Sequence, residues 1–149
     1  MSPPSRRPSS VVARTLGREV NLQPGDVYKV GFPRTDLKVT LGNLRIELGL
    51  ALGSWAAFKK VGEGDEAMVM GDLVLLTAEV NPVITRLLEN GFDVTALHNH
   101  LLGETPRLMY LHYEGRASAA TLAEKRCRVR RRLNAAGRRF RHPWEPPRL

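Results

Sequence analysis

Turn residues divide the first half of this chain into short apolar runs, a spacing typical of strands joined in hairpins. Gly42-Asn43 lies between two of these runs and is a hairpin turn signal. The glycines and charges of residues 62–66 separate two other runs in the same way. We therefore predict strands at residues 27–32, 37–41, 44–48, 50–59 and 67–76.

A helix is predicted to follow at residues 78–89. Thr77 can cap its N-terminus, where Glu79 is also favourable, and Asn90-Gly91 is a stop signal. Apolar side chains recur at helical spacing and give the segment one apolar face. These side chains are Val80, Val83, Ile84, Leu87 and Leu88.

The remaining sequence predicts one more hairpin and a final helix. The hairpin strands are expected at 93–102 and 107–114, and residues 117–133 begin with a helix-like composition. From residue 67 onward the order is therefore β-α-β-β-α, most of a split βαβ sheet. The predicted fold class is α+β, an antiparallel sheet of hairpins with helices packed on one face.

The charge of the chain is unevenly distributed. The 149 residues suit a single domain, and the formal net charge is +8. Residues 1–123 hold 13 Lys and Arg against 13 Asp and Glu, whereas residues 124–149 hold 10 against 2. All of the charge excess therefore lies in the tail, and we predict a flexible lead-in or frayed helix at 1–24, a folded domain at 25–123 and an atypical Arg-rich tail at 124–149.

Neither the cysteine content nor the hydropathy pattern predicts export. Cys127 is the only cysteine of the chain, so the fold needs no internal disulfide. The proline-rich N-terminus leads into no apolar stretch of signal-peptide or membrane-spanning length. As written, the chain is expected to stay in the cytoplasm.

A group of histidines on the second hairpin is the strongest candidate for chemistry. In an extended strand His98 and His100 point to the same face, because successive side chains alternate. Glu104 follows four residues later, and His112 lies on the next apolar run. Divalent metals such as zinc or manganese bind imidazoles and carboxylates. The candidate metal ligands are therefore His98, His100, Glu104 and His112.

The participation of His112 depends on the strand register. Pairing residue 102 with 108 sets His98 opposite His112, whereas pairing 102 with 107 sends His112 to the other face unless a bulge intervenes. Glu104 and His112 are also the candidate catalytic residues. With a metal bound, Glu104 can serve as ligand or general base for hydrolysis by an activated water.

Two alternatives to a metal site stay open. A histidine without a metal can transfer a proton or contact an anion. Alternatively, His98 and His100 are half-buried residues that only hold the hairpin by hydrogen bonds.

Three further polar residues are weaker candidates for ligand contacts. Arg34 and Asp36 follow Phe32-Pro33, where such a pair either faces a ligand or locks a turn. Asp72 stands in an apolar run, and a buried carboxylate needs a partner. Glu79 is expected to act only through helix-end electrostatics.

Five segments carry a family resemblance. They are 25–40 (GDVYKVGFPRTDLKVT), 50–55 (LALGSW), 65–75 (DEAMVMGDLVL), 79–83 (EVNPV) and 95–104 (TALHNHLLGE). Together they resemble the LppY/LpqO-type family over about residues 20–123. The resemblance implies a bacterial domain of unknown function that is often exported or lipid-anchored and often present in two copies. This chain departs from that pattern in its single copy and its Arg-rich ending.

The biochemical function stays open at the level of sequence, because no nucleotide-binding or nucleophile-elbow motif is present. The first hypothesis is a histidine-rich binding pocket, in its most specific form a divalent-metal site that supports hydrolysis. The alternative is a non-catalytic binding or assembly module that forms a homodimer. In that alternative, the basic residues at 125–141 contact nucleic acid or another polyanion.

Overall fold

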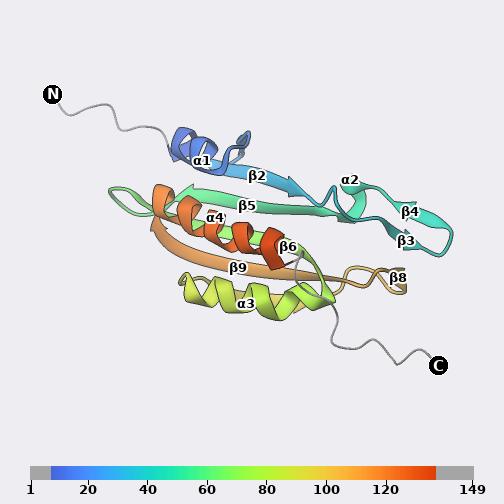
Figure 1. The fold of residues 1–149 in the computed structure, drawn as a ribbon. Coiled ribbons are helices and arrows are strands. Elements are labelled where there is room, and N and C mark those ends of the chain that lie inside the picture. The colour runs from blue at the N-terminus through green and yellow to red at the C-terminus, as the bar shows by residue number, and fades with distance from the viewer. Residues whose placement is uncertain (1–7, 137–149) are drawn as a thin grey trace.

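The computed structural model describes residues 8–136, with side chains through residue 130 (Figure 1). Its elements follow in chain order. They are α1 (Pro8–Leu16), β1 (Asn21–Gln23), β2 (Val27–Pro33), β3 (Val39–Leu41), β4 (Leu44–Ile46), α2 (Leu48–Ala51), β5 (Gly53–Lys60), β6 (Glu66–Leu76), the 3-10 turn η1 (Thr77–Glu79), α3 (Val80–Glu89), β7 (Asp93–His98), β8 (Glu104–Thr105), β9 (Leu108–Ser118) and α4 (Ala119–Ala136).

Two antiparallel sheets form the framework. The larger sheet has the strand order β1-β2-β5-β6-β9-β7, and the smaller has the order β4-β3-β8. Strands β6 and β9 pair from Glu66 opposite Ser118 to Leu76 opposite Leu108. The two hairpins predicted in the first half, β3–β4 and β5–β6, are both present.

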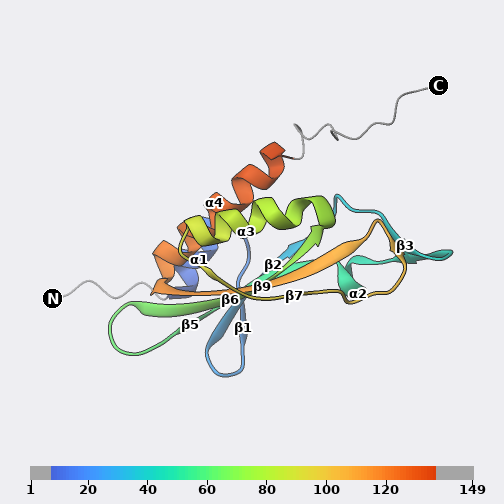
Figure 2. The ribbon, with the colours of Figure 1, turned by 90° about the horizontal axis from the view of Figure 1, so that it is seen from below.

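The long helices pack on one face of the larger sheet. Figure 2 shows α1, α3 and α4 together on that side, with the smaller sheet extending beyond one end. Apolar side chains of both layers are buried between them, which is the main stabilising contribution to such a fold. The predicted α+β class with helices on one face is confirmed. The core includes Val12, Phe58, Leu87, Leu111, Tyr113 and Leu122.

Two glycines allow aromatic rings to lie against the sheet. A Cβ atom on Gly71 would meet the ring of Tyr113, and a Cβ atom on Gly115 would meet the ring of Phe92. The two rings contact each other edge to face, with centroids 5.3 Å apart. A larger residue at position 71 or 115 would displace them from the core.

The connection between the two sheets differs from the prediction. Strands are predicted at 44–48 and 50–59, but β4 ends at Ile46 and Leu48–Ala51 forms α2. One helical turn redirects the chain from the smaller sheet into β5, and the N–H of Leu52 donates to the carbonyl of Leu48 at 3.1 Å. Leu52 is then buried in a second apolar cluster between the sheets. That cluster consists of Val39, Ile46, Leu52, Val74, Leu108 and Tyr110.

The predicted helix at 78–89 is present with a different start. It begins as η1 and continues as α3, and no side-chain cap of Thr77 is formed. The carboxylate of Glu79 instead accepts the N–H of Leu76 at 2.8 Å. Gly91 follows the helix with a φ of 74°, the left-handed conformation expected of a helix stop.

Part of the lead-in predicted at 1–24 is a helix that packs on the core. Residues 8–16 form α1, in which Val12 is fully buried and Leu16 is nearly so. These two apolar side chains lie one helical turn apart in a segment of polar composition, and both pack on the core. Residues 1–7 lie outside the described part of the chain.

The predicted boundary at residue 124 is also corrected. Helix α4 continues to Ala136, and within its basic stretch Arg126 and Val129 are buried. The arginines occupy a helix that packs on the sheet, so residues 124–130 belong to the domain. The rest of the Arg-rich segment, 137–149, lies outside the described residues.

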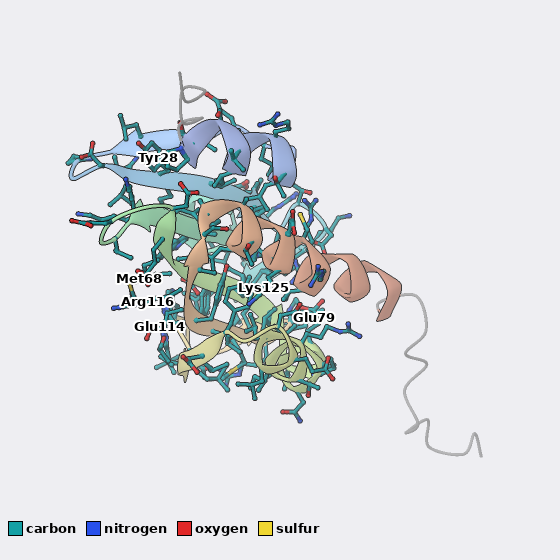
Figure 3. All side chains as sticks on the ribbon, turned by 90° about the vertical axis from the view of Figure 1, so that its left-hand side faces the viewer. Tyr28, Met68, Glu79, Glu114, Arg116 and Lys125 are labelled. Carbon is teal, nitrogen blue, oxygen red and sulfur yellow. The ribbon has the colours of Figure 1, made fainter. Side chains whose placement is uncertain are left out.

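The other face of the larger sheet carries none of the helices α1, α3 and α4. Figure 3 shows Met68, Glu114 and Arg116 on the side away from α4, which carries Lys125. Met70 on this open face is 49% exposed. No helix within residues 8–136 is both long and apolar enough to span a lipid bilayer.

Candidate functional site

Cross-strand pairing gathers the candidate side chains on the open face of the larger sheet. Asp72 of β6 lies opposite His112 of β9, and His112 lies opposite Ala96 of β7. A register shift between Val94 and Ala96 sets this alignment. His112 thereby shares a face with His98, although His98 lies opposite Tyr110 rather than opposite His112.

His98 and His112 are in direct contact. Their Nε2 atoms are 2.9 Å apart, and their ring centroids are 4.9 Å apart with an interplanar angle of 20°. One ring can donate its N–H to the bare nitrogen of the other if their tautomers differ. The two nitrogens can therefore share one proton, and a metal ion could bind at the same point.

His100 lies beside His98 and His112, but it is not placed there by the strand alternation that was predicted. The predicted strand at 93–102 ends early, because β7 stops at His98 and the chain turns toward the smaller sheet. The ring of His100 stacks on Tyr110 with centroids 3.6 Å apart and an interplanar angle of 4°. It also stacks on His98 at 4.9 Å. Stacking on Tyr110, rather than the pleat of a strand, keeps the three imidazoles together.

Asp72 lies behind the histidine pair. The residue is 6% exposed, its Oδ1 lies 4.0 Å from Nε2 of His112, and Oδ1 has no hydrogen-bond partner within the described residues. Burial raises the pKa of Asp72, and the electrostatic interaction with His112 is the strongest effect that opposes this shift. A buried carboxylate oxygen without a partner is costly, so this position favours a proton or a cation.

Tyr110 is part of the site and was missed by the sequence interpretation. Its hydroxyl donates to the carbonyl of Ala51 at 2.7 Å, which fixes the ring under His100. Burial raises the pKa of Tyr110, and the charges of Asp72 and Glu104 raise it further. The available signal was its position two residues before His112, which places both side chains on one face of a strand.

Glu104 does not join the histidines. Its Oε1 accepts the N–H of Leu108 at 2.9 Å, and Arg107 approaches its Oε2 at 3.5 Å. Burial on its own would raise the pKa of Glu104, but the hydrogen bonds from backbone N–H groups and the charge of Arg107 lower it below the ordinary value. The side chain therefore holds the turn between β8 and β9.

The four metal candidates consequently form no single ligand set. Within the part of the chain that the structure describes, no group of three or more His, Cys, Asp or Glu side chains is arranged to hold a metal ion. His98 and His112 are brought together, His100 stacks beside them, and Glu104 lies in the neighbouring turn.

Arg34 and Asp36 form a closed ionic junction together with Glu79. The guanidinium of Arg34 donates to both oxygens of Asp36 at 2.9 Å, to both oxygens of Glu79 at 2.8 and 3.2 Å, and to the carbonyl of Val74 at 2.8 Å. The hydrogen bond from Arg34 lowers the pKa of Asp36. All five N–H donors of this guanidinium are engaged, which favours a turn-locking role over ligand contact. Glu79 is thus more than a helix-end charge, because it connects β2 to the start of α3.

An antiparallel sheet with helices on one face and a histidine pair on the other defines a small α+β domain. The chain belongs to the family described as Domain of Unknown Function (DUF1259), whose match covers residues 10–133. This range includes most of α1 and most of α4, in agreement with their packing on the core. No curated protein and no solved structure matched the chain.

Proposed function

We propose that His98 and His112 form a binding site for a divalent transition metal on the open face of the sheet. The observation that carries the proposal is the 2.9 Å separation of their Nε2 atoms. Metal–imidazole bonds are about 2.0–2.1 Å long, so the nitrogens of two imidazole ligands lie about 2.9 Å apart at a right angle and about 3.3 Å apart at the tetrahedral angle that zinc prefers. A metal could therefore take the place of the shared proton if the two rings move apart by up to about 0.4 Å.

Asp72 supports this proposal by its charge. Its unpartnered Oδ1 faces the histidine pair, and a cation there would compensate the buried carboxylate. At 4.0 Å from Nε2 of His112, Asp72 would have to move to become a third ligand; at its present distance it would act on a bound cation through its negative charge. The remaining coordination positions would be filled by water or substrate, and a bound water would be activated for hydrolysis.

Metal titration of the full, tag-free chain tests the proposal. Calorimetry with Zn²⁺ and Mn²⁺ is expected to give one site, and the double variant His98→Ala/His112→Ala is expected to weaken binding at least about a hundredfold, since both nitrogen ligands are lost. Asp72→Asn should weaken it roughly tenfold, because the negative charge beside the cation is lost.

His142→Ala is the matched control, because it removes a histidine from outside the hairpin. It should bind as the unaltered chain does, and circular dichroism should show that all variants are folded. Equal metal binding by the double variant, or none by the unaltered chain, would contradict the metal site.

Proton transfer is the second candidate, favoured by the contact between His98 and His112 and by the carboxylate of Asp72, which lies 4.0 Å from the same Nε2 atom of His112. His112 is the central member and the candidate general base, whereas Glu104 is engaged in its turn. Under this second candidate, catalysis on a substrate, once one is known, requires His112 and proceeds without added metal.

We further propose that this family is the one resembled by the five sequence segments, the LppY/LpqO type. The support is the agreement between the resemblance at about 20–123 and the family match at 10–133. The cytoplasmic location and the contact of the basic segment with nucleic acid stay predictions. For the latter, Arg128 and Arg130 of α4 are exposed, whereas Arg126 is buried.

A further inference from the structure

A cavity lies on the helix side of the larger sheet, away from the histidines. Its volume is about 450 Å³, and it is lined by β2, β6 and α4 together with the segment that follows α1. Four arginines line it, namely Arg18, Arg34, Arg126 and Arg130. This concentration of positive charge on the covered face has no role in the proposed metal site.

Three of these arginines surround the ring of Phe32. The guanidinium carbons of Arg126, Arg18 and Arg130 lie 4.7, 5.3 and 5.8 Å from its centroid. Each contact is a favourable cation–π interaction. A benzene ring carries no net charge, however, so it leaves the three cations uncompensated.

The carboxylates of the cavity are already engaged. Asp36 and Glu79 line it, and both are bound to the fourth arginine, Arg34. Within residues 8–130, no ion pair joins Arg18, Arg126 or Arg130 to a carboxylate. The described cavity therefore contains three guanidinium groups without a counter-charge.

Arg126 is the most informative of the three. It is 3% exposed, and its Nε donates to the hydroxyl of Tyr113 at 3.0 Å. Its Nη1 is buried and has no hydrogen-bond partner among the described residues. A guanidinium stays protonated at any ordinary pH, so this unpaired donor cannot be removed by losing its charge. A buried charge of this kind is normally compensated by an anion.

We propose that this cavity binds a small oxyanion, a phosphate or carboxylate group, through Arg126 with Arg18 and Arg130. Planar guanidinium groups recognise both anions through paired hydrogen bonds. The cavity volume falls within the range of small-molecule sites. A polynucleotide backbone would need an exposed basic surface, whereas the central arginine here is buried and its ring partner Phe32 is only 7% exposed.

Calorimetric titration of the full chain at low ionic strength, with inorganic phosphate in one arm and citrate in the other, tests the proposal. At least one anion is expected to bind at a single site and to raise the melting temperature. Binding of phosphate alone identifies a phosphate-bearing ligand, and binding of citrate alone identifies a carboxylate. Absence of binding in both arms overturns the proposal.

Charge variants separate a built site from general attraction. Arg18→Gln/Arg130→Gln is expected to weaken anion binding at least about tenfold, and Arg126→Gln to weaken it further if that variant folds. Arg128→Gln removes one charge from the exposed face of α4 without touching the cavity and should change the affinity less than about twofold. If Arg128→Gln weakens binding as much as the cavity variants do, the proposal is wrong. The metal variants His98→Ala/His112→Ala should leave anion binding unchanged, so the two proposals fail or succeed separately.

Discussion

Glu104 was predicted to be a site residue, but its side chain has a structural role in the turn between β8 and β9. In the folded protein the pKa of Glu104 lies below the ordinary value of 4.5, which applies to the unfolded chain. Between the folded and the unfolded pKa, the folded state binds fewer protons than the unfolded state, so stability rises with pH. Glu104→Gln is therefore expected to lose about 1 kcal/mol at pH 7, with the difference from the unaltered chain vanishing as pH falls through the folded pKa. Urea unfolding at pH 7 and pH 3 measures this, with Glu63→Gln in the exposed β5–β6 loop as a neutral control. A loss of equal size at both pH values would show that the charge of Glu104 does not hold the turn.

At the scale of elements, the contact between α1 and α4 decides the extent of the domain. Val12 is fully buried, and the Sγ–H of Cys127 donates to the carbonyl of Thr15 at 3.3 Å, so the two helices lie side by side. Val12→Ala is expected to lower the free energy of unfolding by about 2 kcal/mol, the cost of a truncated core side chain, in chemical denaturation. Arg14→Ala on the exposed side of α1 should change it by less than about 0.5 kcal/mol. If Val12→Ala is equally harmless, residues 8–16 are a dispensable lead-in after all.

At the scale of the whole molecule, the open sheet face is the surface on which a second copy is expected to pack. Met70 is 49% exposed there, and the resemblance to proteins with two copies of this unit favours pairing through one common face. Light scattering is expected to give twice the mass of 16.6 kDa for the full chain. Met70→Glu should shift it to the monomer, whereas Leu88→Glu, a 55% exposed residue on the helix side, should not. A monomeric mass for the unaltered chain at millimolar concentration would exclude this dimer.

Local sequence patterns predicted most of the elements correctly. The turn at Gly42-Asn43, the apolar face of α3 and its stop at Gly91 were recognised because each depends on neighbours within a few residues. Leu88 was wrongly placed on that face, since it is 55% exposed. The misses in α1 and in the basic stretch of α4 share one cause. Val12 and Val129 are buried in the core, and Cys127 bonds to Thr15, so these helices are held by partners far along the chain. Composition alone cannot reveal such partners.

In the candidate site, too, local sequence and tertiary structure determined different features. Sequence alone placed His98, His112 and Asp72 in three separate strands, because alternation and turn residues are local properties. Their meeting was decided by the register of β9 against β6 and β7, including the bulge after Val94, and a shift of one residue would have turned His112 to the other face. Tertiary structure likewise drew Glu104 into the second sheet, stacked His100 on Tyr110 and enclosed Arg126 against Phe32. Sequence determined which residues could carry chemistry and which strands would hold them, and only long-range packing decided which of those residues touch.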